Sequence, residues 1–411
     1  MIKVALFVLL GLIAAAYLIL YFKYNRYRPS RVQYEVLPAA LGYFHNTFED
    51  CRTAFLEKAA QLALRHNGVE VFSIPVPGTT NSNLAIDCSY VPAQRTSRSL
   101  LILSSGVHGI EGFTGSAVQL MAMEELLIPG HLGSTGVLLI HGLNPYGFKY
   151  SRRVTENNVD MNRNCAIEES LFDTHNEGYG KLNDMLNPKG EANHRSLRNR
   201  HFHFIAARKI LNESMHVVRQ ATLQGQYEYP EGVLFGGKRI EPQIIALTPI
   251  LQDKMTPYSR ILTIDLHTGY GHNGTMHLFP NPIEDVKIKT GMEELFAGYP
   301  INWGDSEDFY TYGGAFAEYI GSLAPDKTCY PMAFEFGTLD SQKTLGSLRS
   351  LHNMILENQG FHHGYKNEKA EARIKKAFWE MFYPSYKAWR SKAISDAKRM
   401  LGLVLERLGK G

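Results

Sequence analysis

The feature that most constrains the fold is a short apolar run that stops abruptly at polar and glycine residues. Residues 100–103 (LLIL) have the pattern of a buried strand, and a glycine-rich stretch follows at 104–115. Apolar residues then recur at helical spacing over 117–127. This order predicts a strand, a glycine-rich loop and a helix.

Similar patterns recur along the chain. Strand-like runs lie at 69–74, 84–91, 137–140, 260–266 and 328–336. Helical spacing is found at 47–66, 202–223, 341–356 and 368–408, and Pro384 is expected to break or kink the last of these. Strands that alternate with helices favour an α/β fold with a layered sheet.

Composition excludes several classes of protein. A chain of 411 residues can bury a large core, and its net charge of +3 is small and mixed, so nucleic-acid binding is not indicated. The four cysteines show no Cys-x-x-Cys spacing, which argues against a disulfide scaffold or a thiolate metal site. They do not define the redox compartment.

The N-terminus contains an apolar segment, residues 4–22, that carries no charge. Its length is close to the ~20 residues that cross a bilayer, so we expect one transmembrane anchor. The alternative is a cleaved signal peptide, but the segment exceeds the usual ~7–15-residue apolar region and no small-residue cleavage site follows. Four basic residues follow the segment and only Lys3 precedes it, which favours a cytoplasmic location for the rest of the chain.

Chemistry-bearing side chains lie at the ends of the strand-like runs. His108 and Glu111 stand three apart in the glycine-rich loop and would make two-thirds of an open zinc site that needs one more histidine. The same pair is also typical of a polar loop with a favourable charge at a helix start. His267 and Glu335 follow or end two other runs, and ligands of α/β sheets bind at the C-terminal ends of strands. These four residues are therefore expected in one crevice.

Two further regions bear on this crevice. Asp265 could orient His267, although residues two apart in a strand point the same way, which leaves direct pairing open. The loop at 149–164 is too rich in specific polar groups to be only a connection. Its polar residues include Arg152, Arg153, Asn157, Asn158, Asp160, Asn162, Arg163 and Asn164.

Five motifs occur in a fixed order: GVHGIEG at 106–112, NPYGF at 144–148, Arg153 with NVDMNRN at 158–164, DLHTG at 265–269 and FEFGT at 334–338. Together they resemble the zinc carboxypeptidase superfamily, and most closely its branch known as domain-of-unknown-function family 2817. The likeness extends over residues 69–360. It implies an α/β fold with a mixed sheet between helices, preceded here by the transmembrane helix.

The resemblance also implies roles for individual residues. It implies that His108, Glu111 and His267 bind one zinc ion with water in the open position, and that Glu335 is the general base that deprotonates this water. By the same likeness, Arg153 polarises the scissile carbonyl and stabilises the oxyanion.

The likeness assigns substrate binding less completely. Asn162 and Arg163 match the pair that grips a substrate carboxylate. The mobile tyrosine of the superfamily has two candidates, Tyr310 and Tyr312. The residue that sets side-chain preference has no identifiable match.

We therefore expect a membrane-anchored zinc hydrolase that cleaves an amide bond next to a free carboxylate, in a peptide or an N-acyl amino acid. One alternative is an N-acyl amino acid deacylase of the succinylglutamate desuccinylase and aspartoacylase type. Another is a non-catalytic binding protein on the same fold. The expected organisation is an anchor at 4–22, a linker and packing helix at 23–68, a catalytic domain at 69–360 and a helical extension at 361–411; the oligomeric state is not indicated.

Overall fold

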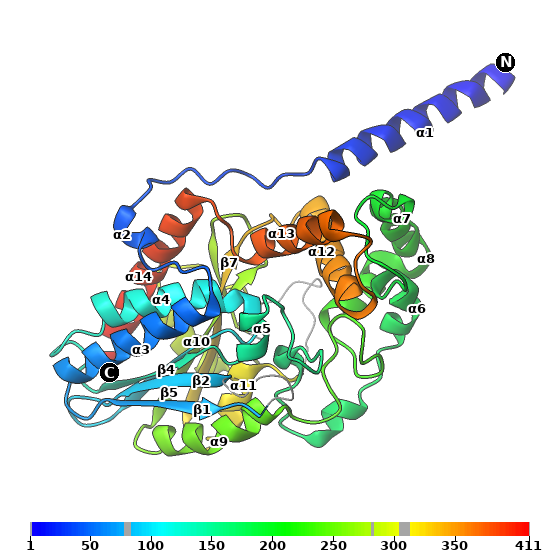
Figure 1. Cartoon of the computed structure of the whole chain (residues 1–411). Helices are drawn as coiled ribbons and strands as arrows, with labels where there is room; N and C mark the ends of the chain where they lie inside the picture. The colour runs from blue at the N-terminus through cyan, green and yellow to red at the C-terminus, as the bar shows by residue number, and fades with distance from the viewer. Residues whose placement is uncertain (1, 78–83, 281–282, 304–312, 411) are drawn as a thin grey trace.

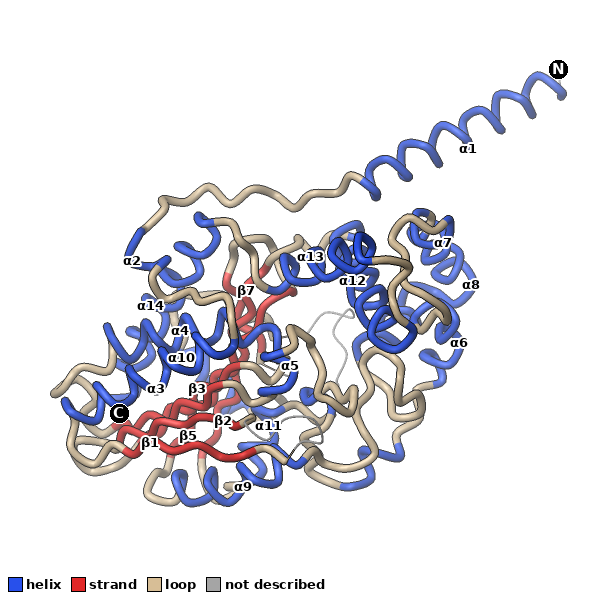
Figure 2. Tube along the Cα trace, viewed as in Figure 1, coloured by secondary structure: helices blue, strands red, loops and turns tan. Residues whose placement is uncertain are grey.

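A seven-stranded mixed sheet forms the centre of the molecule (Figures 1 and 2). The computed structural model describes residues 2–77, 84–280, 283–303 and 313–410. The strands are β1 (Glu70–Pro75), β2 (Ala85–Val91), β3 (Ser99–Ser105), β4 (Thr135–His141), β5 (Arg260–Gly269), β6 (Met276–Phe279) and β7 (Thr328–Gly337). Their order across the sheet is β1-β2-β4-β3-β5-β7-β6. The predicted α/β class with a mixed sheet is confirmed.

The central strands are parallel, and this fixes where the polar residues meet. β4, β3, β5 and β7 run parallel to one another, whereas β1, β2 and β6 pair antiparallel to their neighbours. All residues of β3 and β4 are buried, as expected for strands covered on both faces. Parallel strands end at the same edge, so the loops after β3, β5 and β7 lie together.

Helices cover both faces of the sheet (Figures 1 and 2). On one face lie α3 (Phe48–Arg65), α4 (Gly112–Glu125) and α14 (Lys387–Lys410), and on the other α9 (Pro242–Met255) and α11 (Phe316–Ser322). The remaining α-helices of the body are α2 (Pro38–Leu41), α5 (Pro145–Lys149), α6 (Glu177–Leu186), α7 (Leu197–Arg200), α8 (Phe202–Leu223), α10 (Val286–Leu295), α12 (Thr344–His363) and α13 (Glu368–Phe382).

Side-chain caps mark several of the helix starts. Thr47 Oγ1 accepts a hydrogen bond from Asp50 N at the start of α3, and Asn367 Oδ1 accepts one from Ala370 N at the start of α13. The break expected at Pro384 separates α13 from α14. The largest apolar cluster contains residues of α3, the sheet and α14, so the expected packing helix and C-terminal extension share one core with the sheet.

The structure differs from the sequence prediction at two places near the glycine-rich loop and the sheet edge. The helix predicted from residue 117 begins at Gly112, directly after a short 3₁₀ helix, η1 (Gly109–Glu111). A Cβ at Gly115 would lie 2.5 Å from Ser105 Cβ, so this glycine permits the close approach of helix and strand. The short edge strand β6 was not predicted.

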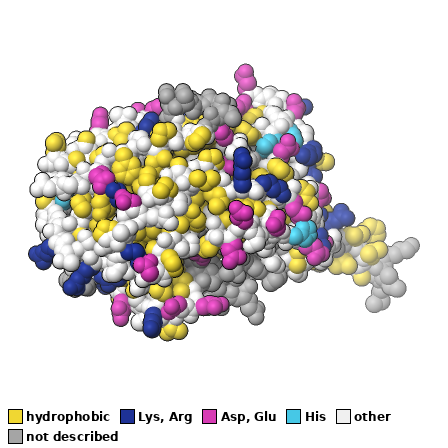
Figure 3. All heavy atoms as spheres, turned by 90° about the horizontal axis from the view of Figure 1, so that it is seen from below, with side chains coloured by type: hydrophobic (Ala, Val, Ile, Leu, Met, Phe, Trp, Pro, Cys, Tyr) yellow, Lys and Arg dark blue, Asp and Glu magenta, His cyan; other side chains and the backbone are white. Residues whose placement is uncertain are grey.

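The N-terminal helix α1 (Ile2–Asn25) extends away from the body, and its apolar atoms stand clear of it in the view of Figure 3. Its span Val4–Asn25 is long and apolar enough to cross a membrane, a test that a signal sequence also passes. The four cysteines are unpaired.

Candidate metal centre

Three segments bring His108, Glu111 and His267 together. His108 lies in the loop after β3, Glu111 closes η1, and His267 lies near the end of β5. One potential ligand atom from each residue lies within 4.8 Å of the others, and all three side chains are buried. Among the residues that the structure describes, these three form the one cluster of histidine, cysteine and acidic side chains that could hold a metal ion.

The carboxylate of Glu111 lies between the two imidazoles. Its Oε1 is 3.0 Å from His108 Nδ1, and its Oε2 is 3.0 Å from His267 Nδ1. The backbone N–H of Thr268 also donates to Oε2, at 3.0 Å. Both histidines therefore turn the same ring nitrogen toward one carboxylate.

The opposite nitrogen of each imidazole faces another acid. His108 Nε2 is 3.1 Å from Asp160 Oδ1, and His267 Nε2 is 2.8 Å from Asp265 Oδ2. The pairing of Asp265 with His267 that the sequence left open therefore occurs, and Ser104 Oγ donates to Asp265 Oδ1 at 2.7 Å. His108 Nε2 also accepts a hydrogen bond from Arg153 Nη2, at 2.6 Å. In both histidines Nε2 faces these outer groups and Nδ1 faces Glu111, so Nδ1 is the ring nitrogen directed toward a candidate metal.

The donor set fits a zinc ion. Two imidazoles and one carboxylate are a ligand set of catalytic zinc sites, which keep a fourth position open. The buried Nδ1 of His108 makes no hydrogen bond of acceptable geometry among the described residues, although Glu111 is near. A buried ring nitrogen without a hydrogen-bond partner calls for an explanation, and a metal ion bound between this nitrogen and the carboxylate of Glu111 would supply one.

Buried charges hold these groups in their ionised forms. Burial alone raises the pKa of Glu111, but the two imidazoles outweigh it and hold the pKa below its usual range. Burial lowers the pKa of His267, yet Asp265 and Glu111 raise it well above the ordinary value. A metal at His267 Nδ1 must therefore displace a proton, so metal binding weakens as pH falls.

Glu335 and Arg153 flank the three residues. Glu335 on β7 pairs in register with His267 on β5, and its Oε1 accepts a hydrogen bond from Tyr270 N at 2.8 Å. Burial and the charge of Glu111 raise the pKa of Glu335 to about 8. Arg153 donates from Nη1 to Glu111 Oε1 at 3.2 Å and from Nε to Asp160 Oδ2 at 3.0 Å.

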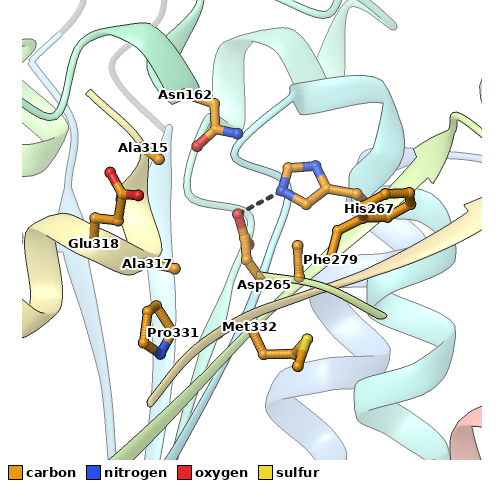
Figure 4. Close-up of a pocket in the computed structure, with 10 residues that line it drawn as sticks. Asn162, Asp265, His267, Phe279, Ala315, Ala317, Glu318, Pro331 and Met332 are labelled. Atoms are coloured by element: carbon orange, nitrogen blue, oxygen red, sulfur yellow. Dashed lines mark ion pairs between the residues drawn. The ribbon is translucent and has the colours of Figure 1, made fainter. Parts of the chain in front are cut away.

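Asn162 and Arg163 lie near the centre but make different contacts. Asn162 lines a small cavity beside His267 (Figure 4). Its Oδ1 accepts a hydrogen bond from Phe316 N. The guanidinium of Arg163 donates to the carbonyl of Leu223 at the end of α8, at 2.7 and 3.1 Å, and to the carbonyl of Asn162. Tyr310 and Tyr312 lie outside the described residues.

The sequence reasoning missed the role of Asp160. This buried side chain bridges Arg153 and His108. Burial raises the pKa of Asp160, but the interactions with Arg153 and His108 outweigh it and hold this pKa well below its usual range. Its place in the polar loop, seven residues after Arg153, was the available signal.

Comparisons with known proteins place these residues in a family of uncharacterised activity. The sequence pattern described as "Protein of unknown function (DUF2817)" matches residues 44–396, a longer region than the resemblance read from the motifs. No curated protein matches.

Two solved structures show a distant likeness. Bovine thrombin-activatable fibrinolysis inhibitor, in complex with tick carboxypeptidase inhibitor, is 13% identical with a TM-score of 0.43, over 77% of this chain and 97% of that one. A metallo-carboxypeptidase from Pseudomonas aeruginosa is 12% identical with a TM-score of 0.38, over 77% and 69%.

We predict that His108→Ala and Gly109→Ala both lower the metal content of the purified protein. The first removes a ligand; the second adds a Cβ that would lie 2.1 Å from the backbone of Gly147, so the loop must move. Metal analysis and circular dichroism check this, with Gly402→Ala as control because its Cβ meets only ordinary contacts. Full metal occupancy in His108→Ala would contradict the ligand assignment.

Proposed function

The chain belongs to the DUF2817 family, and we propose that it is a zinc-dependent hydrolase that cleaves an amide bond next to a free carboxylate. The observation that carries this proposal is the convergence of His108, Glu111 and His267, with Glu335 on the neighbouring strand. A zinc ion held there supplies a Lewis acid and lowers the pKa of a water molecule. The motifs that resemble zinc carboxypeptidases support the same reaction class.

Glu335 is the general base of this proposal. Its carboxylate lies at the edge where β5 and β7 end, beside the candidate metal ligands but without an ion-pair partner among them. A raised pKa suits a group that must accept a proton and later return it to the leaving amine. Arg153, held by Glu111 and Asp160, is fixed in orientation to donate to the carbonyl oxygen of the substrate.

We predict that Glu335→Gln lowers turnover by ~10²–10⁴-fold, because an amide keeps the shape of the side chain but accepts no proton. Metal content should stay unchanged. Turnover is measured on whichever peptide or N-acyl amino acid the parent cleaves, and Glu124→Gln, at an exposed position on α4, is the control. Unchanged turnover in Glu335→Gln removes this residue from the mechanism.

Arg163 is the proposed contact for the substrate carboxylate. Its present hydrogen bonds to Leu223 and Asn162 carbonyls give it a structural role as well, so a test must separate the two roles. Loss of a charge-assisted hydrogen bond is worth ~1.5–3 kcal/mol, which corresponds to ~10–100-fold in kcat/KM.

We therefore predict that the parent prefers free-acid substrates over their amides by ~10–100-fold, and that Arg163→Lys reduces this preference because an ammonium makes no two-pronged contact. The melting temperature of each protein is measured alongside. A variant that melts earlier but keeps the preference has lost only the contact with α8. Equal cleavage of acid and amide by the parent would favour an internal-bond amidase.

The substrate class is tested in the same assay. Cleavage of peptides, but not of N-acyl amino acids, supports the carboxypeptidase-like reaction; the opposite result supports the deacylase alternative. A protein that binds zinc, peptides and N-acyl amino acids but cleaves neither class of substrate would support the non-catalytic alternative.

We also propose that α1 anchors the enzyme and that the body is cytoplasmic. The apolar span and the basic residues that follow it support this. We predict that full-length protein stays in membranes after an alkaline carbonate wash, and that a reporter fused to the C-terminus is active only on the cytoplasmic side. A mature chain that begins after Phe22 would replace the anchor by a cleaved signal peptide.

A further inference from the structure

The last turns of α1 pack against the body, so α1 is held by side-chain contacts as well as by the linker that follows it. The ring of Tyr17 meets that of Phe204 on α8 edge to face, with centroids 5.9 Å apart. Arg200 Nε donates to the hydroxyl of Tyr21 at 2.8 Å. One turn later, the buried hydroxyl of Tyr24 is 2.7 Å from His352 Nδ1 on α12. The direction of α1 relative to the body is therefore set by side-chain contacts.

If α1 spans a bilayer as proposed, the position of Tyr17 brings part of the body to the membrane surface. Tyr17 lies inside the apolar run that ends at Phe22. If the bilayer began before Tyr17, roughly 13 residues would remain to cross it, or ~20 Å, whereas the hydrocarbon layer is ~30 Å thick. The run to Phe22 gives ~28 Å, and the contact of Tyr17 with Phe204 then lies ~8 Å inside its end. A surface at that depth lies in the interfacial layer of a bilayer.

The surface at this place has the composition of an interfacial contact. We name it the α7–α8 apex and define it by Leu197, Phe204, Arg208 and Leu211. Leu197, Phe204 and Leu211 are 76%, 54% and 85% exposed. Phe204, Arg208 and Leu211 lie on α8 at positions i, i+4 and i+7, so they share one face of the helix. Phe202 and Ala206 of the same helix are buried against the body.

Charge around the α7–α8 apex favours an anionic surface. The segment from 193 to 212 contains five basic residues and no acidic one, and one of the five, Lys209, forms an ion pair with Asp184 on α6 at 2.8 Å. The basic residues are Arg195, Arg198, Arg200, Arg208 and Lys209. A helix with exposed apolar side chains among basic ones is typical of binding to anionic lipid. In Figure 1, α7 and α8 lie at the end of the body beside α1.

We propose that the α7–α8 apex is a second membrane contact, which rests in the interfacial layer of an anionic lipid bilayer next to α1. This rests on the proposed anchoring by α1. The body is then held by two points, a spanning helix and an adsorbed surface, and its orientation toward the bilayer is fixed.

The test is depth-dependent quenching on full-length protein in lipid nanodiscs that contain anionic lipid. Cys329, the half-buried native cysteine, is replaced in Cys329→Ser, and an environment-sensitive fluorophore is attached to Leu197→Cys or Leu211→Cys. Leu64→Cys, 89% exposed at the far end of α3, is the matched control. Leu12→Cys, in the middle of α1, reports the anchor itself. Two quenching lipids are used: one has a nitroxide at the top of its acyl chain, for the labels at 64, 197 and 211, and the other has it near the end of the chain, for the label at 12.

Labels at positions 197 and 211 are expected to lose most of their fluorescence and to shift to the blue, while the label at position 64 does neither. Replacing the anionic lipid by neutral lipid should weaken quenching at 197 and 211 but not at 12. Quenching at 12 with none at 197 or 211 overturns the second contact and leaves the anchor standing. No quenching at 12 overturns the anchor and this inference together. The unlabelled cysteine variants at 197 and 211 are also tested for disulfide cross-links between two copies of the chain. Cross-linking there, together with no quenching of the labelled proteins, would show that a second copy of the chain covers the apex and would overturn the lipid contact.

Discussion

The ionised carboxylate of Glu111 is the group on which the candidate site depends. An unpartnered charge buried this deeply would cost several kcal/mol. Two imidazoles, the N–H of Thr268 and the guanidinium of Arg153 offset that cost, and they come from the loop after β3, the end of β5 and the loop after α5. One buried acid therefore ties three segments together, and the acids behind the histidines extend the network outward.

Much of this arrangement was predictable from local sequence. Apolar runs bounded by glycine and polar residues identified six of the strands, and α8 has the predicted bounds. Because parallel strands end at one edge, the positions of His108, His267 and Glu335 at the ends of such runs were enough to bring them together. The α/β class followed from the alternation alone.

The rest depended on contacts between residues far apart in sequence. β6 has four residues and pairs at an edge, so its local pattern is weak. Arg163 bonds a carbonyl sixty positions away, which no motif encodes. The sequence prediction placed Gly112 and Gly115 in a loop, yet α4 begins at Gly112. Its Gly115 packs against Ser105 of β3, where a Cβ would lie only 2.5 Å away, so this glycine is set by a contact between helix and strand and not by local structure. Tyr17 on α1 and Phe204 in the apex are separated by nearly half the chain, yet their rings are in contact.

The register of β5 with its neighbours β3 and β7 determines whether the candidate metal ligands come together when the chain folds. His267 is the cross-strand partner of Glu335, and Ser104 on β3 is the partner of Asp265. Because side chains alternate between the faces of a strand, a slip of one residue would turn each of these groups to the opposite side of the sheet. The same slip would move apolar side chains out of the core. A metal ion taken up at the proposed site would therefore distinguish correctly paired molecules from compact mispaired ones, because only the correct register brings its ligands together.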